Sequence, residues 1–301
     1  MMFDLIIIGA GPAGITASVY AARKKMGILV ITRDIGGQAA WSGDIENYTG
    51  YQFITGPELA GKFEEHMRKY GIELRENEQV LGIKKKNEGV WVKTDKGTYE
   101  GKTAIIASGK RSRELAVPGE RKFKNRGLTY CATCDGPLFA GKDVAVVGGG
   151  NSALDATLQL IQIARHIYLI NITPDLTGDL VMREKVRENN KVSILNSTRV
   201  TAVLGEKMVS RIKIRREDKE ETLPVEGVFV EVGLIPNSEF AKDLEKNGRG
   251  EIKVNSCNET NIPGIFAAGD VTDVPEKQIV IAAGEGAKTA LSAFSYLAQH
   301  R

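Results

Sequence analysis

Two cysteines and an aspartate form the most reactive group of side chains in this sequence. Cys131 and Cys134 lie two residues apart, and Asp135 follows at once. A pair at this spacing closes a small ring, and thiolate attack on a disulfide is how such a pair passes electrons to another protein. A carboxylate beside the second cysteine is a candidate general acid and base. An ordinary turn aspartate before a Gly-Pro pair is the alternative for Asp135.

Two glycine-rich turns predict two dinucleotide sites. In each, an apolar strand leads directly into a G-x-G-x-x-G/A pattern and then into a helix, which is the context that this fingerprint requires. The glycines allow a tight turn, a close approach to a pyrophosphate at the helix N-terminus, and close packing of helix on strand. The candidate residues are Gly9, Gly11, Pro12, Ala13 and Gly14 in the first turn, and Gly148, Gly150, Asn151, Ser152 and Ala153 in the second.

A zinc half-site is the alternative for the two cysteines. It needs two further ligands, and the remaining cysteine and the three histidines are isolated in the sequence. We therefore expect no metal site. Cys257 lies in a polar turn without a basic neighbour, so we expect it to be a bystander.

The elements around the turns indicate an α/β protein with two Rossmann-like domains, the second inserted into the first. The expected strands are 4–8, 28–32, 143–147, 166–170 and 264–268, and the expected helices are 15–22, 154–163 and a tail from Gly286 onward. Because the tail is expected to pack on the first unit, residues 1–115 and 246–301 are assigned to one domain. Residues 116–245 form the other.

Charge and composition exclude several classes of partner. Lys and Arg number 41 and Asp and Glu 38, so the net charge of +3 on 301 residues predicts no nucleic acid or membrane partner. No apolar run is long enough to span a bilayer. Three cysteines suit a compartment that keeps thiols reduced, so we expect a cytoplasmic protein.

With these residues in view, the chain resembles the low-molecular-weight thioredoxin reductase family of flavoproteins. The motifs are GAGPAG at 9–14, GGQ at 36–38, ENY at 46–48, ASG at 107–109, CATCDG at 131–136, GGGNSA at 148–153 and AAGD at 267–270. The second half is most similar to the flavoprotein subunit of alkyl hydroperoxide reductase, through CDGPLF at 134–139, GVFVEVGLIPNS at 227–238 and KQIVIAAGEGAK at 277–288. That subunit has an additional N-terminal disulfide domain with no counterpart in this sequence, so we expect a separate protein as the partner.

The resemblance implies a path for electrons from a nicotinamide dinucleotide through FAD to the cysteine pair, and on to a thioredoxin-like or glutaredoxin-like protein. It implies that Cys134 faces the flavin, that Cys131 attacks the partner, and that Asp135 handles protons. It adds Gly233 to the nicotinamide site, and it implies a homodimer because relatives form one. The implied FAD contacts are Gly9, Gly11, Pro12, Ala13, Gly14, Gln38, Asn47, Gly109, Asp270, Gln278 and Ile279.

The choice of electron donor depends on the residues after strand 166–170. NADPH-dependent relatives place arginines there, whose guanidinium groups bind the 2′-phosphate. This sequence has Asn171, a candidate cofactor contact whose neutral amide can bond a ribose hydroxyl, and no arginine before Arg183, so NADH is favoured and NADPH is the alternative. The missing arginines leave a different donor, such as ferredoxin, open. A flavin-based redox sensor is the non-enzymatic alternative, although a sensor has little use for a second dinucleotide site.

Overall fold

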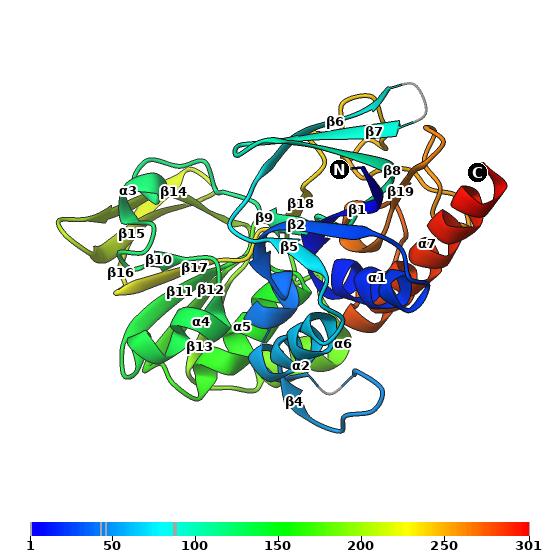
Figure 1. Ribbon diagram of the computed structural model, residues 1–301. Helices are drawn as coiled ribbons and strands as arrows, with labels where there is room; N and C mark the ends of the chain where they lie inside the picture. The colour runs from blue at the N-terminus through cyan, green and yellow to red at the C-terminus, as the bar shows by residue number, and fades with distance from the viewer. Residues whose placement is uncertain (1, 43, 46, 87–88, 301) are drawn as a thin grey trace. The chain divides into compact units, whose positions relative to one another are not determined.

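The computed structural model describes residues 2–42, 44–45, 47–86 and 89–300, with only the backbone of Asp44, Thr133 and Cys134 (Figure 1). The chain forms two compact units, Met1–Arg111 with Ile235–Arg301 (unit 1) and Ser112–Leu234 (unit 2). From the sequence, the domain boundaries were expected after residues 115 and 245. Two short strands, β9 (Lys110–Ser112) and β18 (Leu234–Pro236), lie where the chain passes between the units, and they pair with each other.

Unit 1 contains a mostly parallel sheet. In the described part of the chain its strands are β1 (Phe3–Ala10), β2 (Ile28–Ile35), β5 (Glu73–Arg75), β6 (Val80–Lys86), β7 (Gly89–Thr94), β8 (Thr98–Ile106) and β19 (Ile265–Ala267). The order is β5-β2-β1-β8-β7-β6, with β19 beside β8. Ile8 of β1 and Ala267 of β19 both pair with Ile106 of β8, in parallel. The segments that follow these three strands therefore meet at one edge of the sheet.

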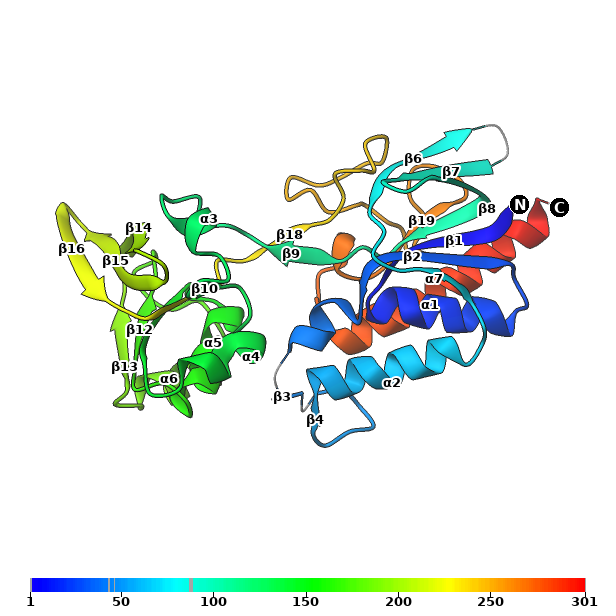
Figure 2. The same ribbon diagram turned by 60° about the vertical axis from the view of Figure 1, so that its left-hand side comes forward.

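Helices cover one face of this sheet and an irregular segment covers the other. Figure 2 shows α1 (Pro12–Arg23), α2 (Gly56–Arg68) and α7 (Ile279–Gln299) on one side. Small buried residues such as Ala17 of α1 and Ala290 of α7 let these helices pack closely in the core under the sheet. On the opposite face, Leu244 and Ile252 pack against strand residues such as Ile6.

Unit 2 is a second three-layer arrangement. Its parallel strands are β10 (Leu128–Thr129), β11 (Asp143–Val147), β12 (His166–Ile170), β13 (Val192–Leu195) and β17 (Gly227–Val230), in the order β10-β17-β11-β12-β13. The helices α5 (Asn151–Ile161) and α6 (Leu180–Arg187) pack on one face. An antiparallel sheet of β14 (Thr198–Gly205), β15 (Val209–Arg216) and β16 (Lys219–Pro224) packs on the other. The continuous apolar runs of β11 and β12 suit strands covered on both faces.

Short elements complete the two units. In unit 1 they are η1 (Gly37–Trp41), β3 (Asp44–Ile45), β4 (Ile54–Thr55) and η3 (Gly269–Val271), and in unit 2 they are α3 (Glu120–Phe123), α4 (Ala132–Asp135) and η2 (Gly136–Phe139). Within the described ranges, no helix combines the length and the hydropathy that crossing a membrane requires.

The architecture confirms the predicted α/β class, in which a mostly parallel sheet in unit 1 and a parallel sheet in unit 2 each carry one glycine turn. The start of the last helix differs from the prediction. α7 begins at Ile279 rather than near Gly286, so Gly284 and Gly286 lie inside it. A β-carbon on Gly286 would lie 2.1 Å from the carbonyl oxygen of Ala13, so this glycine permits close contact with α1 and does not end the helix.

Candidate functional site

The first glycine turn joins β1 to α1 at the carboxyl edge of the unit 1 sheet. Gly9 has a φ of 105°, and a β-carbon there would lie 2.3 Å from the oxygen of Ala107. A β-carbon on Gly14 would lie 1.9 Å from the oxygen of Gly9. Gly11 caps α1 without any side-chain hydrogen bond, and in the described part of the chain no atom beyond its own sequence neighbours lies within 4 Å of the position of its missing β-carbon. The helix N-terminus is therefore open to an anion, which fits the pyrophosphate of a dinucleotide.

Several of the residues predicted to contact FAD gather around this turn. A β-carbon on Gly37, next to Gln38, would lie 3.3 Å from the Cα of Gly11, and one on Gly269, next to Asp270, would lie 3.0 Å from the Cβ of Ala13. Because these residues follow parallel strands, they share the edge where such sheets hold ligands. Burial raises the pKa of Asp270.

The remaining FAD candidates in unit 1 are tied to one another by hydrogen bonds. The side-chain amide of Gln38 donates to the carbonyl oxygen of Lys110 at 2.9 Å, beside Gly109. The Asn47 side chain donates to Oε1 of Gln278 at 3.2 Å across 231 residues of sequence. Gln278 is the N-cap residue of α7, and Ile279 is the first residue of that helix. The fold thus brings together candidates from both ends of the chain.

A buried ionic cluster beside these residues was not predicted. Glu251, whose side chain is 5% exposed, lies 2.8 Å from the ammonium of Lys110 and 3.6 Å from that of Lys277, and it accepts a hydrogen bond from Asn247 at 2.6 Å. Burial would raise the pKa of Glu251, but the hydrogen bonds from Lys110 and Asn247 and the two positive charges hold it at about 2. Since Lys110 follows Gly109 and Lys277 precedes Gln278, the cluster fixes the segments that carry both candidates. The only sequence signal was the position of the two lysines beside the motifs.

The second glycine turn joins β11 to α5 in unit 2. Gly148 has a φ of 145°, and a β-carbon there would lie 2.1 Å from the oxygen of Glu231. Gly150 caps α5 without a side-chain hydrogen bond. Ala153, the last residue of the pattern, is fully buried, while Asn151 accepts the backbone N–H of Asp179 at 2.7 Å and so ties the turn to a neighbouring loop. As at Gly11, the N-cap glycine makes no side-chain hydrogen bond, but here the Thr177 hydroxyl lies 3.9 Å from the position of the missing β-carbon of Gly150.

That loop, residues 171–179, follows β12 and is organised by Asn171. The Asn171 side chain is buried, and it donates to the carbonyl oxygens of Thr173 at 3.2 Å and Asp175 at 2.8 Å and to Asn196 at 3.2 Å. Its own oxygen accepts from the Thr173 hydroxyl at 2.9 Å. A β-carbon on Gly149 would lie 2.3 Å from this oxygen, so Asn171 fills the space beneath the turn. In this structure its amide is bonded to loop atoms, and the sequence offered no sign of that.

Two further residues frame the second turn from β17. Glu231 follows that strand and donates its backbone N–H to Val147. Burial and the nearby charge of Asp155 raise the pKa of Glu231 to about 8. Gly233 has a φ of 101°, and among the described residues no atom other than those of its chain neighbours lies within 4 Å of the position of its missing β-carbon. Its carbonyl oxygen accepts the N–H of Arg113. Gly233 was predicted to be at this site, but Glu231 was given no role.

The cysteine segment lies between β10 and η2 in unit 2. Cys131 is part of a disulfide, Cys257 is a free, exposed cysteine, and the side chain of Cys134 lies outside the described atoms. Thr129 connects this segment to the predicted acid. Its hydroxyl donates to the carboxylate of Asp135 and accepts the backbone N–H of Cys131 at 3.1 Å. The sequence predicted Cys131 and Asp135 but not the hydroxyl that bridges them.

A buried carboxylate supports the same segment. Glu120 is 2% exposed, and it accepts the N–H groups of Leu115 and Ala116, each at 2.6 Å, and the hydroxyl of Tyr130 at 2.7 Å. Burial, followed by this hydrogen bond, raises the pKa of Tyr130. Because Tyr130 directly precedes Cys131, Glu120 fixes the approach of the chain to the disulfide.

Comparison with known proteins agrees with this arrangement. The family model of the pyridine nucleotide-disulphide oxidoreductases matches residues 3–286. An alkyl hydroperoxide reductase subunit of Pseudomonas putida is 43% identical over 302 residues, and a protein named NADH dehydrogenase from Ferdinandcohnia aciditolerans is 40% identical over 299. Each match covers 98% of this chain but only 58% and 57%, respectively, of the relative. The chain therefore spans a little under three fifths of the length of these curated relatives.

Solved structures match over the whole chain. Thioredoxin reductase from Lactococcus lactis has a TM-score of 0.93 at 33% identity, and that from T. acidophilum has 0.91 at 36%, with 99% of each chain covered in both cases. These comparisons confirm the resemblance found in the sequence. The chain belongs to the pyridine nucleotide-disulphide oxidoreductase family, and this membership identifies it as an oxidoreductase and implies FAD and a nicotinamide dinucleotide as its cofactors.

Proposed function

We propose that the protein is a flavoprotein disulfide reductase that passes electrons from NADH, through FAD and a Cys131–Cys134 disulfide, to a thioredoxin-like or glutaredoxin-like protein. The observation that carries the proposal is the disulfide at Cys131, held beside Asp135 in the same unit as the second glycine turn. NADPH is the alternative donor. The similarity to thioredoxin reductases and to alkyl hydroperoxide reductase supports this class of reaction.

Unit 1 would hold FAD. The open N-terminus of α1 at Gly11 would take the pyrophosphate, with Gly9, Pro12, Ala13 and Gly14 forming the turn. The tethered side chains of Gln38, Asn47 and Gln278 would complete the site, together with Gly109, Asp270 and Ile279. When bound, FAD supplies a carrier that accepts two electrons from a nicotinamide and delivers them to a disulfide.

Unit 2 would hold the nicotinamide dinucleotide. The open N-terminus of α5 supports a pyrophosphate site formed by Gly148, Gly150, Asn151, Ser152 and Ala153, with Gly233 beside it. Asn171 would act here by positioning the loop against the turn.

The protein's own sulfur chemistry follows from the two cysteines. In the reduced state the Cys131 thiolate would attack a disulfide of the partner, forming a mixed disulfide and releasing one partner sulfur as a thiolate. The Cys134 thiolate would then attack Cys131, which restores the internal disulfide and releases the second partner sulfur. Two electrons leave the cysteine pair, and Asp135 would hold and pass a proton to the departing sulfur. A homodimer in the cytoplasm remains the expectation, based on the resemblance and on the cysteine content.

The test combines flavin absorbance with one substitution. Anaerobic NADH should bleach the flavin of the wild type and of Cys134→Ser alike, whereas only the wild type should reduce thioredoxin. Cys257→Ser is the matched control, because Cys257 is exposed and free, and it should behave as the wild type. Reduction of thioredoxin by Cys134→Ser would refute the mechanism. Bleaching by reduced ferredoxin but by neither nicotinamide would favour the alternative donor, and absence of turnover with any donor would favour a redox sensor.

A further inference from the structure

The loop at residues 171–179 is attached to the second glycine turn by its backbone. The N–H groups of Thr177 and Gly178 donate to the carbonyl oxygen of Gly149, at 2.7 and 3.1 Å. The loop follows β12, the second strand of the βαβ unit. In dinucleotide-binding units of this kind, the residues at this strand end face the adenosine ribose and decide between a 2′-hydroxyl and a 2′-phosphate.

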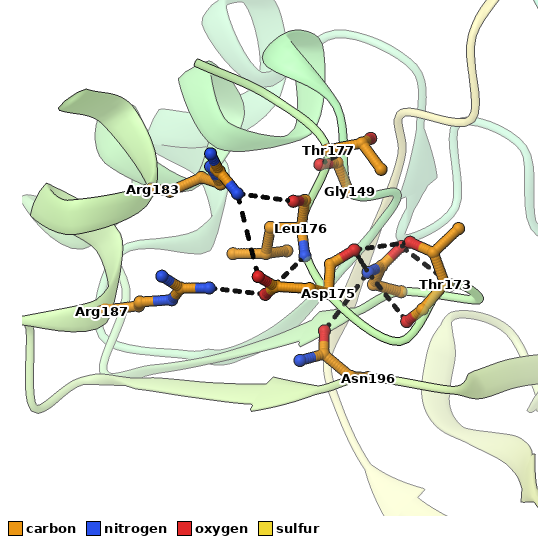
Figure 3. A network of polar contacts seen from close by, with 9 residues as sticks. Gly149, Thr173, Asp175, Leu176, Thr177, Arg183, Arg187 and Asn196 are labelled. Atoms are coloured by element: carbon orange, nitrogen blue, oxygen red, sulfur yellow. Dashed lines mark hydrogen bonds and ion pairs between the residues drawn. The ribbon is translucent and has the colours of Figure 1, made fainter. Parts of the chain in front are cut away.

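Two arginines of α6 point toward this loop, and Asp175 engages both (Figure 3). Arg187 donates to Oδ1 of Asp175 at 2.5 Å. Arg183 donates to the carbonyl oxygen of Leu176 at 3.1 Å and lies 3.8 Å from Oδ2 of Asp175. The hydrogen bond from Arg187 is also the main cause of a lowered pKa of Asp175. The carboxylate is therefore charged at neutral pH and is shared by two guanidinium groups.

The side chains of this group remain accessible. Asp175 is 54% exposed, Arg187 43% and Arg183 25%. Free guanidinium groups at this position are suited to a forked contact with a phosphate. Here the two groups already share one carboxylate of the protein, which offsets one of their two positive charges and would repel a phosphate brought to the loop.

We propose that Asp175 is a specificity-determining residue, which holds Arg183 and Arg187 so that the site selects a dinucleotide with a free 2′-hydroxyl. The proposal rests on the proposed function, because it assumes that unit 2 binds the nicotinamide nucleotide. Arg183 and Arg187 come later in the sequence than the arginines of NADPH-dependent relatives. They nevertheless lie at the loop, where Asp175 engages both.

Binding of two small probes to the purified, FAD-loaded chain tests this proposal by calorimetry at fixed low ionic strength. The probes are 5′-ADP and 2′,5′-ADP, which differ by the 2′-phosphate. Asp175→Asn removes the charge and keeps the size of the side chain. It should tighten binding of 2′,5′-ADP by about fivefold, the upper limit of what an exposed ion pair of this kind supports, while 5′-ADP affinity changes less than about twofold.

Two further variants separate the causes. Glu184→Gln removes one negative charge from the exposed face of the same helix and should leave the affinity for both probes within about twofold. Asp175→Asn combined with Arg187→Gln should lose the gain for 2′,5′-ADP. If the double variant keeps the gain, Asp175 acts through its own charge and the arginine part is refuted.

The remaining outcomes are distinct. If the wild type binds 5′-ADP but Asp175→Asn gains nothing for 2′,5′-ADP, the role of Asp175 is refuted and the proposed function stands. If the FAD-loaded wild type binds neither probe, the second dinucleotide site fails, and the proposed function and this inference fall together.

Discussion

Replacement of Glu120 by alanine should destabilise unit 2 and disturb the disulfide segment. The carboxylate is buried and accepts three hydrogen bonds, from the N–H groups of Leu115 and Ala116 and from the hydroxyl of Tyr130. It therefore ties the chain near the start of unit 2 to the residue before Cys131. Among the described hydrogen bonds, those of all three donors go to Glu120.

The expected loss in the free energy of unfolding depends on which hydrogen-bond donors lose their partner in Glu120→Ala. Ala116 is exposed, so its N–H can bond to water after the substitution. Leu115 and Tyr130 are partly buried, and an unsatisfied buried donor costs about 1–3 kcal/mol. Two such donors, offset by relief from burying the carboxylate, give an expected loss of about 3 kcal/mol in the free energy of unfolding of unit 2.

Two measurements check this value. Because a chain of two units need not unfold in one step, native-state hydrogen exchange of peptides from unit 2 should report the loss locally. Ultraviolet titration should show a lower pKa for Tyr130 in Glu120→Ala, since one of the causes of its raised pKa is removed, and Tyr130→Phe identifies the signal. Transfer to thioredoxin should fall, while bleaching of the flavin by NADH is retained.

Glu114→Ala is the control for Glu120→Ala. Its side chain is 46% exposed, and its ion pair partner Arg121, at 3.8 Å, is 90% exposed. The expected loss is below about 0.5 kcal/mol. A loss of less than about 1 kcal/mol for Glu120→Ala, or equal losses for both variants, would refute the assignment of Glu120 as the anchor of this segment.

Three further changes give separate tests. Thr129→Val should slow thioredoxin reduction about tenfold and shift the pH profile of this reaction, because the Thr129 hydroxyl orients Asp135. Thr129→Ser keeps the hydroxyl and should behave like the wild type. Unchanged pH profiles in stopped-flow assays would contradict this role of Thr129. The raised pKa of Glu231 means that the folded protein retains a proton between pH 4.5 and 8 that the unfolded chain releases, so unit 2 should lose stability as pH rises through this window. Glu231→Gln should remove that slope in urea unfolding, and an unaltered slope would exclude Glu231 as its source. Gly286→Ala should lower the free energy of unfolding of unit 1 by about 1–3 kcal/mol and weaken FAD retention, because the new methyl group forces α7 away from Ala13. Gly284→Ala has open space around it and should be neutral or stabilising by up to about 1 kcal/mol. Equal thermal shifts for the two variants would contradict the importance of the contact between Gly286 and Ala13.

Local patterns in the sequence were sufficient for the turns and for much of the central strands. The strands predicted at 143–147 and 166–170 have the same bounds as β11 and β12. The two glycine turns also form where predicted, because each depends on backbone angles and a helix start within six residues. The predicted start of the last helix, near Gly286, was wrong, because α7 begins at Ile279 and Gly286 lies inside it in close contact with α1.

The hydrogen-bond partners of individual side chains could not be predicted from such patterns. Asn171 had the position of a ribose contact, but in the structure it supports its own loop through Thr173 and Asp175. The roles of Glu120 and Thr129 were missed because their importance comes from hydrogen bonds that no motif encodes.

The amino-acid sequence alone identified the residue types, the two turns and the family, since these rest on spacings of a few residues. Only the tertiary structure decided which distant groups meet, as Lys110 meets Glu251 across 141 residues and Asn47 meets Gln278 across 231. The physical reason is that a side chain's pKa and hydrogen bonds depend on neighbours within a few ångströms, and the topology of the sheets determines which neighbours those are.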